Sequence, residues 1–458
     1  MPTIELGELG PGSTGGPVRA VGGGSGRDIG RSAQGRRDSL RYGLVAVLAG
    51  ALTLVTAGNP LPRPLPELSV PARLGAAVYA VGEWLFVSDP LGPGAAGQDL
   101  VAYRIPTDAR DAPAELVPRW RTVLPPGELH TPTVLGATLV LSTRSYRVAD
   151  DPGRVLALDL DTGVVRWTRE AYLEVVNPAG QLLFAGPPES SVDPPGATLH
   201  AVDPHSGAVR WSLPGPAGVR RHYPWLGGAA PPSVVVVEPS GRVETRDTGT
   251  AALIRTIELP PPGDGRDPRW HGGIVGELFL VRAAETITAY GVPALDRRWS
   301  ATVDDSREFG PIPCGEDLCS YGRHGGVRVW DTATGRTRWT SDRWDGLHRA
   351  GEELLGVSRS EPDRAGTLSV LDAATGRPVA DLGAWQILDE ARAAPRFIGV
   401  RIDADRRTWV AEIDARSRQV RLLTVLHGIS DDCGLAEGWL YCRRVDASVG
   451  LWPLPTRP

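Results

Sequence analysis

The sequence contains no lysine. All 49 basic residues among its 458 residues are arginines, and they stand against 54 acidic residues, for a formal net charge of −5. The absence of lysine excludes Schiff-base chemistry, and the negative net charge gives no reason to expect nucleic-acid binding. A basic complement made only of arginine is typical of a GC-rich bacterial genome, such as that of an actinobacterium.

Asparagine is almost as scarce. It occurs only at Asn59 and Asn177, and each is followed by proline, so neither lies in a glycosylation sequon. A metal site with an asparagine ligand therefore has almost no candidate. The sequence also lacks the Gly-x-Ser-x-Gly, His-Glu-x-x-His and Gly-x-x-x-x-Gly-Lys motifs of hydrolases, zinc proteases and nucleotide-binding loops.

What the chain does contain is an internal repeat. An aspartate recurs every 40 to 44 residues at positions 159, 203, 247, 331, 372 and 414, with Gly291 in the corresponding place of one further copy. The best copies read Ala157-Leu-Asp159-Leu-Asp-Thr-Gly163-Val-Val-Arg-Trp167 and Ala201-Val-Asp203-Pro-His-Ser-Gly207-Ala-Val-Arg-Trp211. A period of this length is typical of stacked supersecondary units.

Each unit has the pattern of four short strands separated by turn residues, which predicts an all-β β-propeller of four-stranded antiparallel blades. Counting third strands gives eight full units and a partial one at Trp439–Trp452, which ends before its outer strand. The segment Glu67–Val70 is a candidate for the missing strand. We predict eight blades, the commoner number in propellers of this type, with nine as the alternative.

The three recurring residue types have structural roles in this prediction. The aspartate accepts hydrogen bonds from the turn that follows it, the glycine takes a positive φ, and the tryptophan covers the junction with a neighbouring blade. The residues that we assign to the motif are Asp159, Gly163, Trp167, Asp203, Gly207, Trp211, Asp331, Gly335, Trp339, Asp372 and Gly376. The motif decays in the units of Asp247, Gly291 and Asp414, where we expect a surface shaped by a partner.

The pattern Ala-x-Asp-x-x-x-Gly-x-x-x-Trp resembles the tryptophan-docking motif of the pyrroloquinoline quinone (PQQ) type β-propellers, over roughly residues 67–458. In the dehydrogenases of that family, a disulfide between adjacent cysteines contacts a quinone that is held with calcium. This sequence has no Cys-Cys dipeptide and lacks the long insertions that build such a site. We therefore expect no cofactor, no metal site and no enzyme activity. A PQQ- and calcium-dependent oxidoreductase is the alternative.

The N-terminal region predicts a membrane anchor. Residues 1–41 are rich in Gly, Ser, Arg and Pro, which is typical of a disordered tail. Residues 42–58 form an apolar segment that we predict to be a transmembrane helix, followed by a Pro-rich linker at 59–66 and the propeller at 67–458. Arginines before the segment predict a cytoplasmic N-terminus. The alternatives are a signal peptide cleaved after Ala57 and a buried helix.

Four cysteines occupy corresponding places in two units. Cys314 and Cys319 flank a short loop between the first two strands of their unit, and Cys433 and Cys442 bracket the same hairpin in the last unit. Neighbouring strands are close enough for a disulfide, so we predict two local disulfides, which favour an extracytoplasmic location. A shared zinc site is the alternative.

Five histidines fall where an outer strand leads into the next inner strand: His130, His222, His271, His348 and His427. As a hypothesis, they form a polar rim near the mouth of the central channel, for a ligand or a pH-dependent contact. The alternative is a set of loop histidines satisfied by water or backbone.

These features together predict a membrane-anchored, extracytoplasmic propeller. The motif also resembles that of the outer-membrane assembly lipoprotein of this propeller family, which is a scaffold. We therefore predict a non-enzymatic binding or scaffold module for a protein, a peptide or an envelope polymer. The first alternative to this function is the oxidoreductase. The second is a transmembrane sensor whose tail signals inward.

Overall fold

The computed structural model describes residues 65–91, 97–107, 115–130, 132–144, 153–185, 198–216, 218–224, 230–259, 271–283, 285–303, 308–314, 317–322, 325–358, 366–388 and 395–455. The predicted tail, the predicted transmembrane helix and most of the predicted linker lie outside these ranges. Within them, no helix has both the length and the apolar character needed to cross a membrane.

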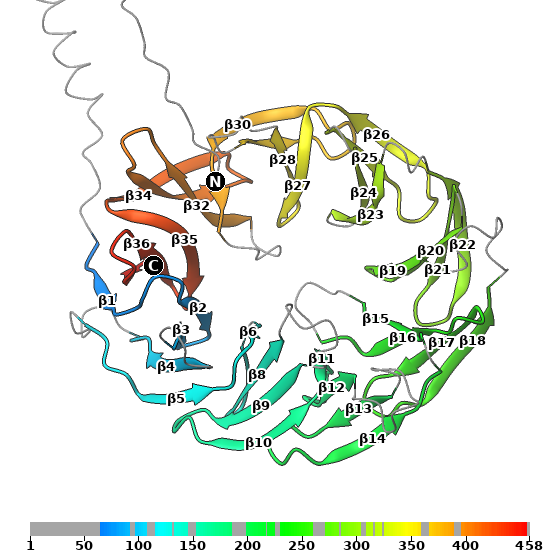
Figure 1. Ribbon diagram of the computed structural model, residues 1–458. Coiled ribbons are helices and arrows are strands. Elements are labelled where there is room, and N and C mark those ends of the chain that lie inside the picture. Colours follow the sequence, from blue (N-terminus) through cyan, green and yellow to red (C-terminus); the bar gives the residue numbers. More distant parts are fainter. Residues whose placement is uncertain are drawn as a thin grey trace, which may run out of the picture. The chain divides into compact units, whose positions relative to one another are not determined.

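The described strands form nine antiparallel sheets, which follow one another around a ring (Figure 1). In eight of these sheets, chain order runs from the centre of the ring to its perimeter, and each sheet is one blade of a propeller (Figure 1). In blade 2 the inner strand is divided into two short pieces, which pair with the same neighbouring strand. The architecture is thus an all-β propeller of four-stranded blades, as the repeat predicts.

Blades 1 to 3 occupy the blue to green part of the ring. Blade 1 contains β2 (Ala77–Val81), β3 (Trp84–Pro90), β4 (Gln98–Arg104) and β5 (Trp120–Leu124). Blade 2 contains β6 (Glu128–Leu129), β7 (Thr133–Leu135), β8 (Thr138–Arg144), β9 (Arg154–Asp159) and β10 (Val165–Glu170). Blade 3 contains β11 (Tyr172–Val176), β12 (Leu182–Ala185), β13 (Leu199–Val202) and β14 (Val209–Leu213).

Blades 4 to 6 continue the ring. Blade 4 contains β15 (Arg220–His222), β16 (Ser233–Val237), β17 (Arg242–Asp247) and β18 (Leu253–Glu258). Blade 5 contains β19 (His271–Val275), β20 (Leu278–Ala283), β21 (Thr286–Gly291) and β22 (Asp296–Thr302). Blade 6 contains β23 (Glu308–Cys314), β24 (Asp317–Gly322), β25 (Val327–Trp330) and β26 (Thr337–Ser341).

Blades 7 to 9 complete it. Blade 7 contains β27 (Trp344–Ala350), β28 (Glu353–Ser358), β29 (Thr367–Leu371) and β30 (Pro378–Ala384). Blade 8 contains β31 (Gln386–Ile387), β32 (Arg396–Ile402), β33 (Thr408–Asp414) and β34 (Gln419–Leu426). Blade 9 contains β35 (Ile429–Ala436), β36 (Trp439–Arg444) and β37 (Val449–Pro453), with β1 (Leu68–Val70) as its outer strand.

The prediction of eight blades was wrong, and the alternative of nine is correct. The partial unit at the C-terminus is a complete blade, because β1 pairs antiparallel with β37 and supplies the fourth strand, with Val70 opposite Val449. The predicted borrowing of a strand from residues 67–70 is thereby confirmed. The first and last segments of the propeller are joined in one sheet, which closes the ring.

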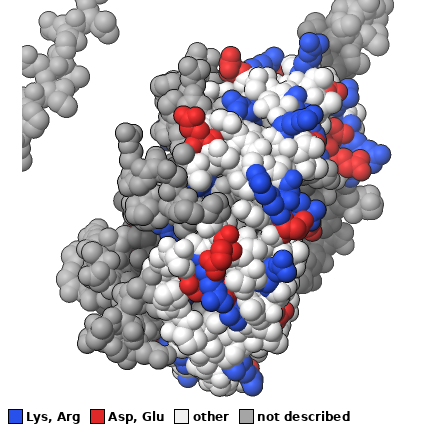
Figure 2. Space-filling model, turned by 90° about the vertical axis from the view of Figure 1, so that its right-hand side faces the viewer, with Lys and Arg blue, Asp and Glu red and all other residues white. Residues whose placement is uncertain are grey.

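The hydrophobic core is divided among the junctions between blades. One cluster joins Phe86 and Leu100 of blade 1 to Leu139 and Leu158 of blade 2, and others repeat this arrangement around the ring. Burying a side chain of this size stabilises the fold by about 1.5–3 kcal/mol. At the perimeter, arginine and acidic side chains lie near one another on a largely uncharged surface (Figure 2).

Candidate functional site

The repeated aspartates serve the turns that follow them. The Oδ1 atom of Asp159 accepts hydrogen bonds from the backbone N–H of Thr162 at 2.9 Å and from its hydroxyl at 2.8 Å. Gly163 ends this turn at φ +69°, a left-handed conformation that favours glycine. Asp203, Asp247, Asp331 and Asp372 accept equivalent bonds from Ser206, Thr250, Thr334 and Thr375.

An arginine of the outer strand completes these turns. The Nη2 atom of Arg166 lies 2.5 Å from Oδ2 of Asp159, and Arg210–Asp203 and Arg338–Asp331 repeat the pair. The hydrogen bonds from Thr162 and Arg166 hold the pKa of Asp159 below its usual value. The predicted motif did not include this arginine, although it stands seven residues after the aspartate and directly before the tryptophan in each of the three copies.

The tryptophan of one blade docks on the turn of the next. The Nε1 atom of Trp339 in blade 6 donates a hydrogen bond of 2.9 Å to the carbonyl oxygen of Ala373 in blade 7. Its ring lies so close to Gly376 that a Cβ there would be 2.6 Å from a ring carbon. The same packing joins Trp120 to Gly163, Trp167 to Gly207 and Trp299 to Gly335. The motif glycine is therefore required by contact as well as by φ.

The motif alanine accommodates the same tryptophan. Ala157 lies opposite Trp167 in the strand register, and Ala201 and Ala289 lie opposite Trp211 and Trp299. These three alanines have no exposed surface. A small side chain at this position leaves room for the large indole on the adjacent strand.

Two junctions depart from this arrangement through the glycine position. In blade 4, Ala251 takes the turn at φ +61°, and the indole of Trp211 donates to Gly249 instead of Thr248, a shift of one residue. The carbonyl oxygen of Thr248 accepts a 2.7 Å hydrogen bond from the buried Asn177 of blade 3. In blade 5, Leu295 takes the turn at φ +54°.

Leu295 compensates for a missing tryptophan. Blade 4 has Arg255 where blades 2, 3, 5 and 6 carry the docking tryptophan, so its outer strand offers no indole to the turn of blade 5. The Leu295 side chain is only 3% exposed and packs with Val235 and Phe279 in the core of that junction. At this junction the tryptophan and the glycine are therefore both absent.

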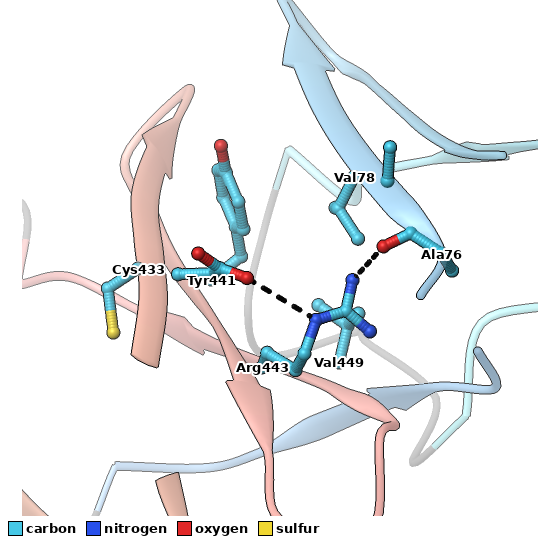
Figure 3. Close-up of a pocket in the computed structure, with 8 residues that line it drawn as sticks. Ala76, Val78, Cys433, Tyr441, Arg443 and Val449 are labelled. Carbon is cyan, nitrogen blue, oxygen red and sulfur yellow. Dashed lines mark hydrogen bonds and ion pairs between the residues drawn. The ribbon is translucent and has the colours of Figure 1, made fainter. Parts of the chain in front are cut away.

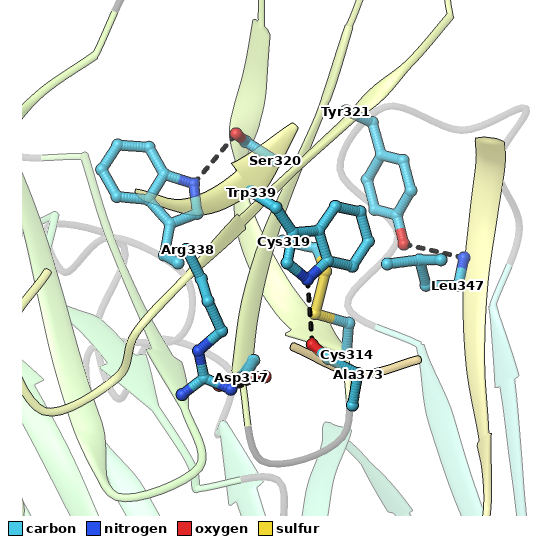
Figure 4. The surroundings of a disulfide bond; sticks show 10 residues. Cys314, Asp317, Cys319, Ser320, Tyr321, Arg338, Trp339, Leu347 and Ala373 are labelled. Carbon is cyan, nitrogen blue, oxygen red and sulfur yellow. Dashed lines mark hydrogen bonds and ion pairs between the residues drawn. A yellow bond between two sulfur atoms is a disulfide. The ribbon is translucent and has the colours of Figure 1, made fainter. Parts of the chain in front are cut away.

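The cysteines form two separate pairs. Cys314 and Cys319 have an S–S distance of 1.92 Å, and Cys433 and Cys442 one of 2.08 Å, so both pairs lie at disulfide distance as predicted. The first pair lies beside the docked indole of Trp339 (Figure 4). The pairs belong to blades 6 and 9, and among the described residues no group of three or more His, Cys, Asp or Glu side chains is placed to hold a metal ion.

The five histidines lie in five different blades or their connections. In the register, His222 and His348 on inner strands β15 and β27 lie opposite the third residue of the next strand, and His271 opposite the fifth. His130 follows β6, and the exposed His427 precedes β35. They are thus spread around the ring, and the rim hypothesis remains a prediction.

His222 differs from an exposed histidine. Burial, with a smaller contribution from the charge of Arg220, lowers its pKa to about 4. Its ring centroid lies 5.7 Å from that of Phe279 in the next blade. In the folded protein the imidazole is therefore neutral near pH 7.

A polar cluster that the sequence did not reveal joins the inner strands of blades 3 and 4. The Nη1 atom of Arg221 lies 2.8 Å from Oε1 of Glu174, and the Tyr223 hydroxyl donates a 2.5 Å hydrogen bond to Oε2 of the same carboxylate. Burial and the Glu174 charge raise the pKa of Tyr223 well above its usual value. The carboxylate is satisfied by its neighbours, so the cluster holds the two strands together.

A cavity of about 350 Å³ lies at the seam between the first and last blades (Figure 3). Ala76, Val78, Tyr441 and Val449 are among its lining residues. Arg443 donates to the backbone oxygens of Ala76 and Ala447 and lies 3.6 Å from the Asp432 carboxylate. These bonds use most donors of the guanidinium, so Arg443 joins the two blades rather than presenting a charge to a ligand.

The docked tryptophans, the Asp-Gly turns and the nine four-stranded blades define a repeat β-propeller. A family model described as "Outer membrane protein assembly factor BamB" matches residues 15–240. This match supports the assignment of the chain to the PQQ-type β-propeller repeat family. No curated protein matches it.

Three solved structures are similar to the chain at low identity. BamB from Moraxella catarrhalis is 14% identical, with 86% of this chain and 99% of that chain covered at a TM-score of 0.40. The computationally designed Ika8 protein is 14% identical, with 72% and 96% covered at 0.42. The C-terminal WD40 domain of Sif2 is 10% identical, with 85% and 99% covered at 0.38.

Proposed function

We propose that the protein is a non-enzymatic binding or scaffold module, anchored to the membrane by residues 42–58 and holding its propeller outside the cytoplasm. Its partner is a protein, a peptide or an envelope polymer. The match to the model of an assembly factor supports a role in protein interaction. The two cysteine pairs at disulfide distance are consistent with an oxidising compartment.

The main support for this proposal is the structural role of the repeated aspartates. The Oδ1 atoms of Asp159, Asp203 and Asp331 accept hydrogen bonds within their own turns, and their Oδ2 atoms pair with an arginine of the same blade. These acids stabilise turns and do not converge on a common point. The repeated residues therefore build the propeller itself. We expect a partner to bind at the surfaces that differ between blades.

Cross-linking of the full-length protein in its native membrane tests the proposal. We expect one partner to be captured repeatedly, with its cross-links on residues of the propeller. A chain that ends at residue 66 keeps the predicted tail and apolar segment, and it is the control for capture by the anchor alone. If both chains capture the same neighbours, the propeller is not the binding module.

Reconstitution with PQQ and Ca²⁺ tests the enzyme alternative on the same preparation. Our proposal predicts no change in the quinone absorption spectrum and no reduction of an artificial electron acceptor. A bound-quinone spectrum together with acceptor reduction would establish an oxidoreductase and overturn the proposal.

A further inference from the structure

Arg401 lies between two tryptophan rings in blade 8, the unit of Asp414. It is opposite Trp409 in the β32–β33 register, and Trp385 is the residue directly before β31, the strand on the other side of β32. The Arg401 Cζ atom lies 4.7 Å from the ring centroid of Trp385 and 5.2 Å from that of Trp409. A guanidinium at such distances is attracted to both rings.

Both indoles are fixed by bonds of their own. The Nε1 atom of Trp385 donates to the carbonyl oxygen of Leu382 at 2.8 Å, and that of Trp409 donates to Oδ2 of Asp403 at 2.9 Å. Trp385 is 6% exposed and belongs to the hydrophobic cluster that joins blades 7 and 8. The two indole rings are therefore held in place, and Arg401 packs between them.

The edges of the Arg401 guanidinium remain available. The residue is exposed, and within the described part of the chain it makes no hydrogen bond or ion pair. Other arginines of the blade differ: Arg396 pairs with Asp414 at 2.7 Å and Arg421 with Glu412 at 2.6 Å. Stacking holds the plane of Arg401 while its N–H groups stay free for a bidentate acceptor.

The neighbouring charges do not cancel this cation. Asp403 pairs with Nε of Arg407 at 2.9 Å, and Asp405 pairs with Nη2 of the same arginine at 2.7 Å. Strand β32 thus presents the Arg401 cation between two tryptophan rings, with no ion pair of its own among the described residues.

We propose that this site, formed by Arg401 between Trp385 and Trp409, binds a carboxylate side chain of a partner protein. The proposal rests on the proposed function as a protein-binding module. Tryptophan and arginine are the residue types that dominate binding energy at protein interfaces. A single carboxylate suits the site better than a more highly charged phosphate, because the turn that follows β32 carries Asp405, whose side chain is 72% exposed.

Peptide binding to the full-length protein tests the site directly. The probe is a fluorescent peptide containing Leu-Glu-Leu, compared with the same peptide carrying Gln or phosphoserine in place of Glu. We expect Arg401→Met to weaken binding of the Glu peptide at least tenfold, and Arg401→Lys to weaken it nearly as much because the planar fork is lost. Arg418→Met, an exposed arginine on the same blade, is the matched control and should leave binding unchanged.

The outcomes of these experiments distinguish a failure of the proposed site from a failure of the proposed function. Equal binding by wild type and Arg401→Met, or equal binding of the Glu and Gln peptides by the wild type, would overturn the proposal. Tighter binding of the phosphoserine peptide would overturn the choice of a carboxylate. If native cross-linking captures a propeller partner whose yield is unchanged in Arg401→Met, the site is wrong and the proposed function stands.

Discussion

The indole Nε1 of Trp439 donates a hydrogen bond of 2.9 Å to the carbonyl oxygen of Pro106, which lies 333 residues earlier in the chain. Trp439 is on β36 of blade 9, and Pro106 follows β4 of blade 1. Elsewhere, a docking tryptophan comes from an outer strand. In blade 9 the outer strand is β1, which has no tryptophan, so β36 supplies the indole that joins the last blade to the first.

Removing this indole should open the closure of the ring. Trp439 is 3% exposed, so Trp439→Ala is expected to lower the free energy of unfolding by about 3–5 kcal/mol. Trp439→Phe keeps most of the packing but leaves the Pro106 oxygen without its donor, for a loss of about 1–3 kcal/mol. Urea unfolding measures both variants. A Phe variant as destabilised as the Ala variant would show that the hydrogen bond, rather than the packing, dominates.

Substitution of a motif glycine should cost more than its backbone conformation explains. Gly376→Ala places a Cβ 2.6 Å from the Trp339 ring at φ +68°, whereas Gly180 at φ +73° has nothing within 4 Å of a Cβ. The control Gly180→Ala should lower the free energy of unfolding by only about 1–2 kcal/mol, which is the cost of the left-handed conformation for a residue with a side chain. We expect Gly376→Ala to lose a further 1–3 kcal/mol, roughly, from the steric conflict. Equal losses in thermal unfolding would contradict tryptophan docking on this glycine.

Leu295 and Arg418 both occupy the glycine position of the turn, at φ +54° and φ +59°. Leu295→Gly is expected to destabilise the protein by about 2–5 kcal/mol, because the side chain fills the junction of blades 4 and 5. Arg418 is exposed, so Arg418→Gly should be neutral or slightly stabilising, within about 1 kcal/mol. If Leu295→Gly is also neutral in chemical unfolding, Leu295 does not compensate for the missing tryptophan at this junction.

His222, the last residue of β15, should make the stability of the protein depend on pH. The pKa of His222 is lowered to about 4, from an ordinary value of 6.5. Between these values the unfolded chain binds a proton that the folded protein does not, so stability falls as pH drops from 6.5 to 4. His222→Gln should flatten this slope, and a substitution of the exposed His427 by Gln is the control. Unfolding curves at half-unit pH steps measure the effect, and identical slopes in all three proteins would refute the assignment.

The sequence predicted those parts of the fold that repeat. Asp159, Gly163 and Trp167 recur together because one turn and one docking contact recur, and the cysteine pairs follow from adjacent positions in a hairpin. The predicted number of blades was wrong because we followed the commoner number of eight, although a count that includes the partial unit and the strand at residues 67–70 gives nine. Compensation by Leu295 and closure by Trp439 depend on contacts between blades, and the arrangement of Arg401 depends on strand pairing within blade 8. No local sequence pattern encodes these contacts.

Closure of the nine-bladed ring through β1 is the central structural claim. Val70 on β1 lies opposite Val449 on β37, and both are fully buried. Because adjacent residues of a strand face opposite sides, Val70→Cys with Val449→Cys should form a disulfide, while Ser69→Cys with Val449→Cys should not.

Mobility of the full-length variants on a non-reducing denaturing gel is the most direct measurement. The nine-bladed account predicts a fast-migrating, internally linked species for the paired cysteines only, which disappears on reduction. Absence of that species, or equal yields from the paired and the offset cysteines, would contradict the closure of the ring by β1.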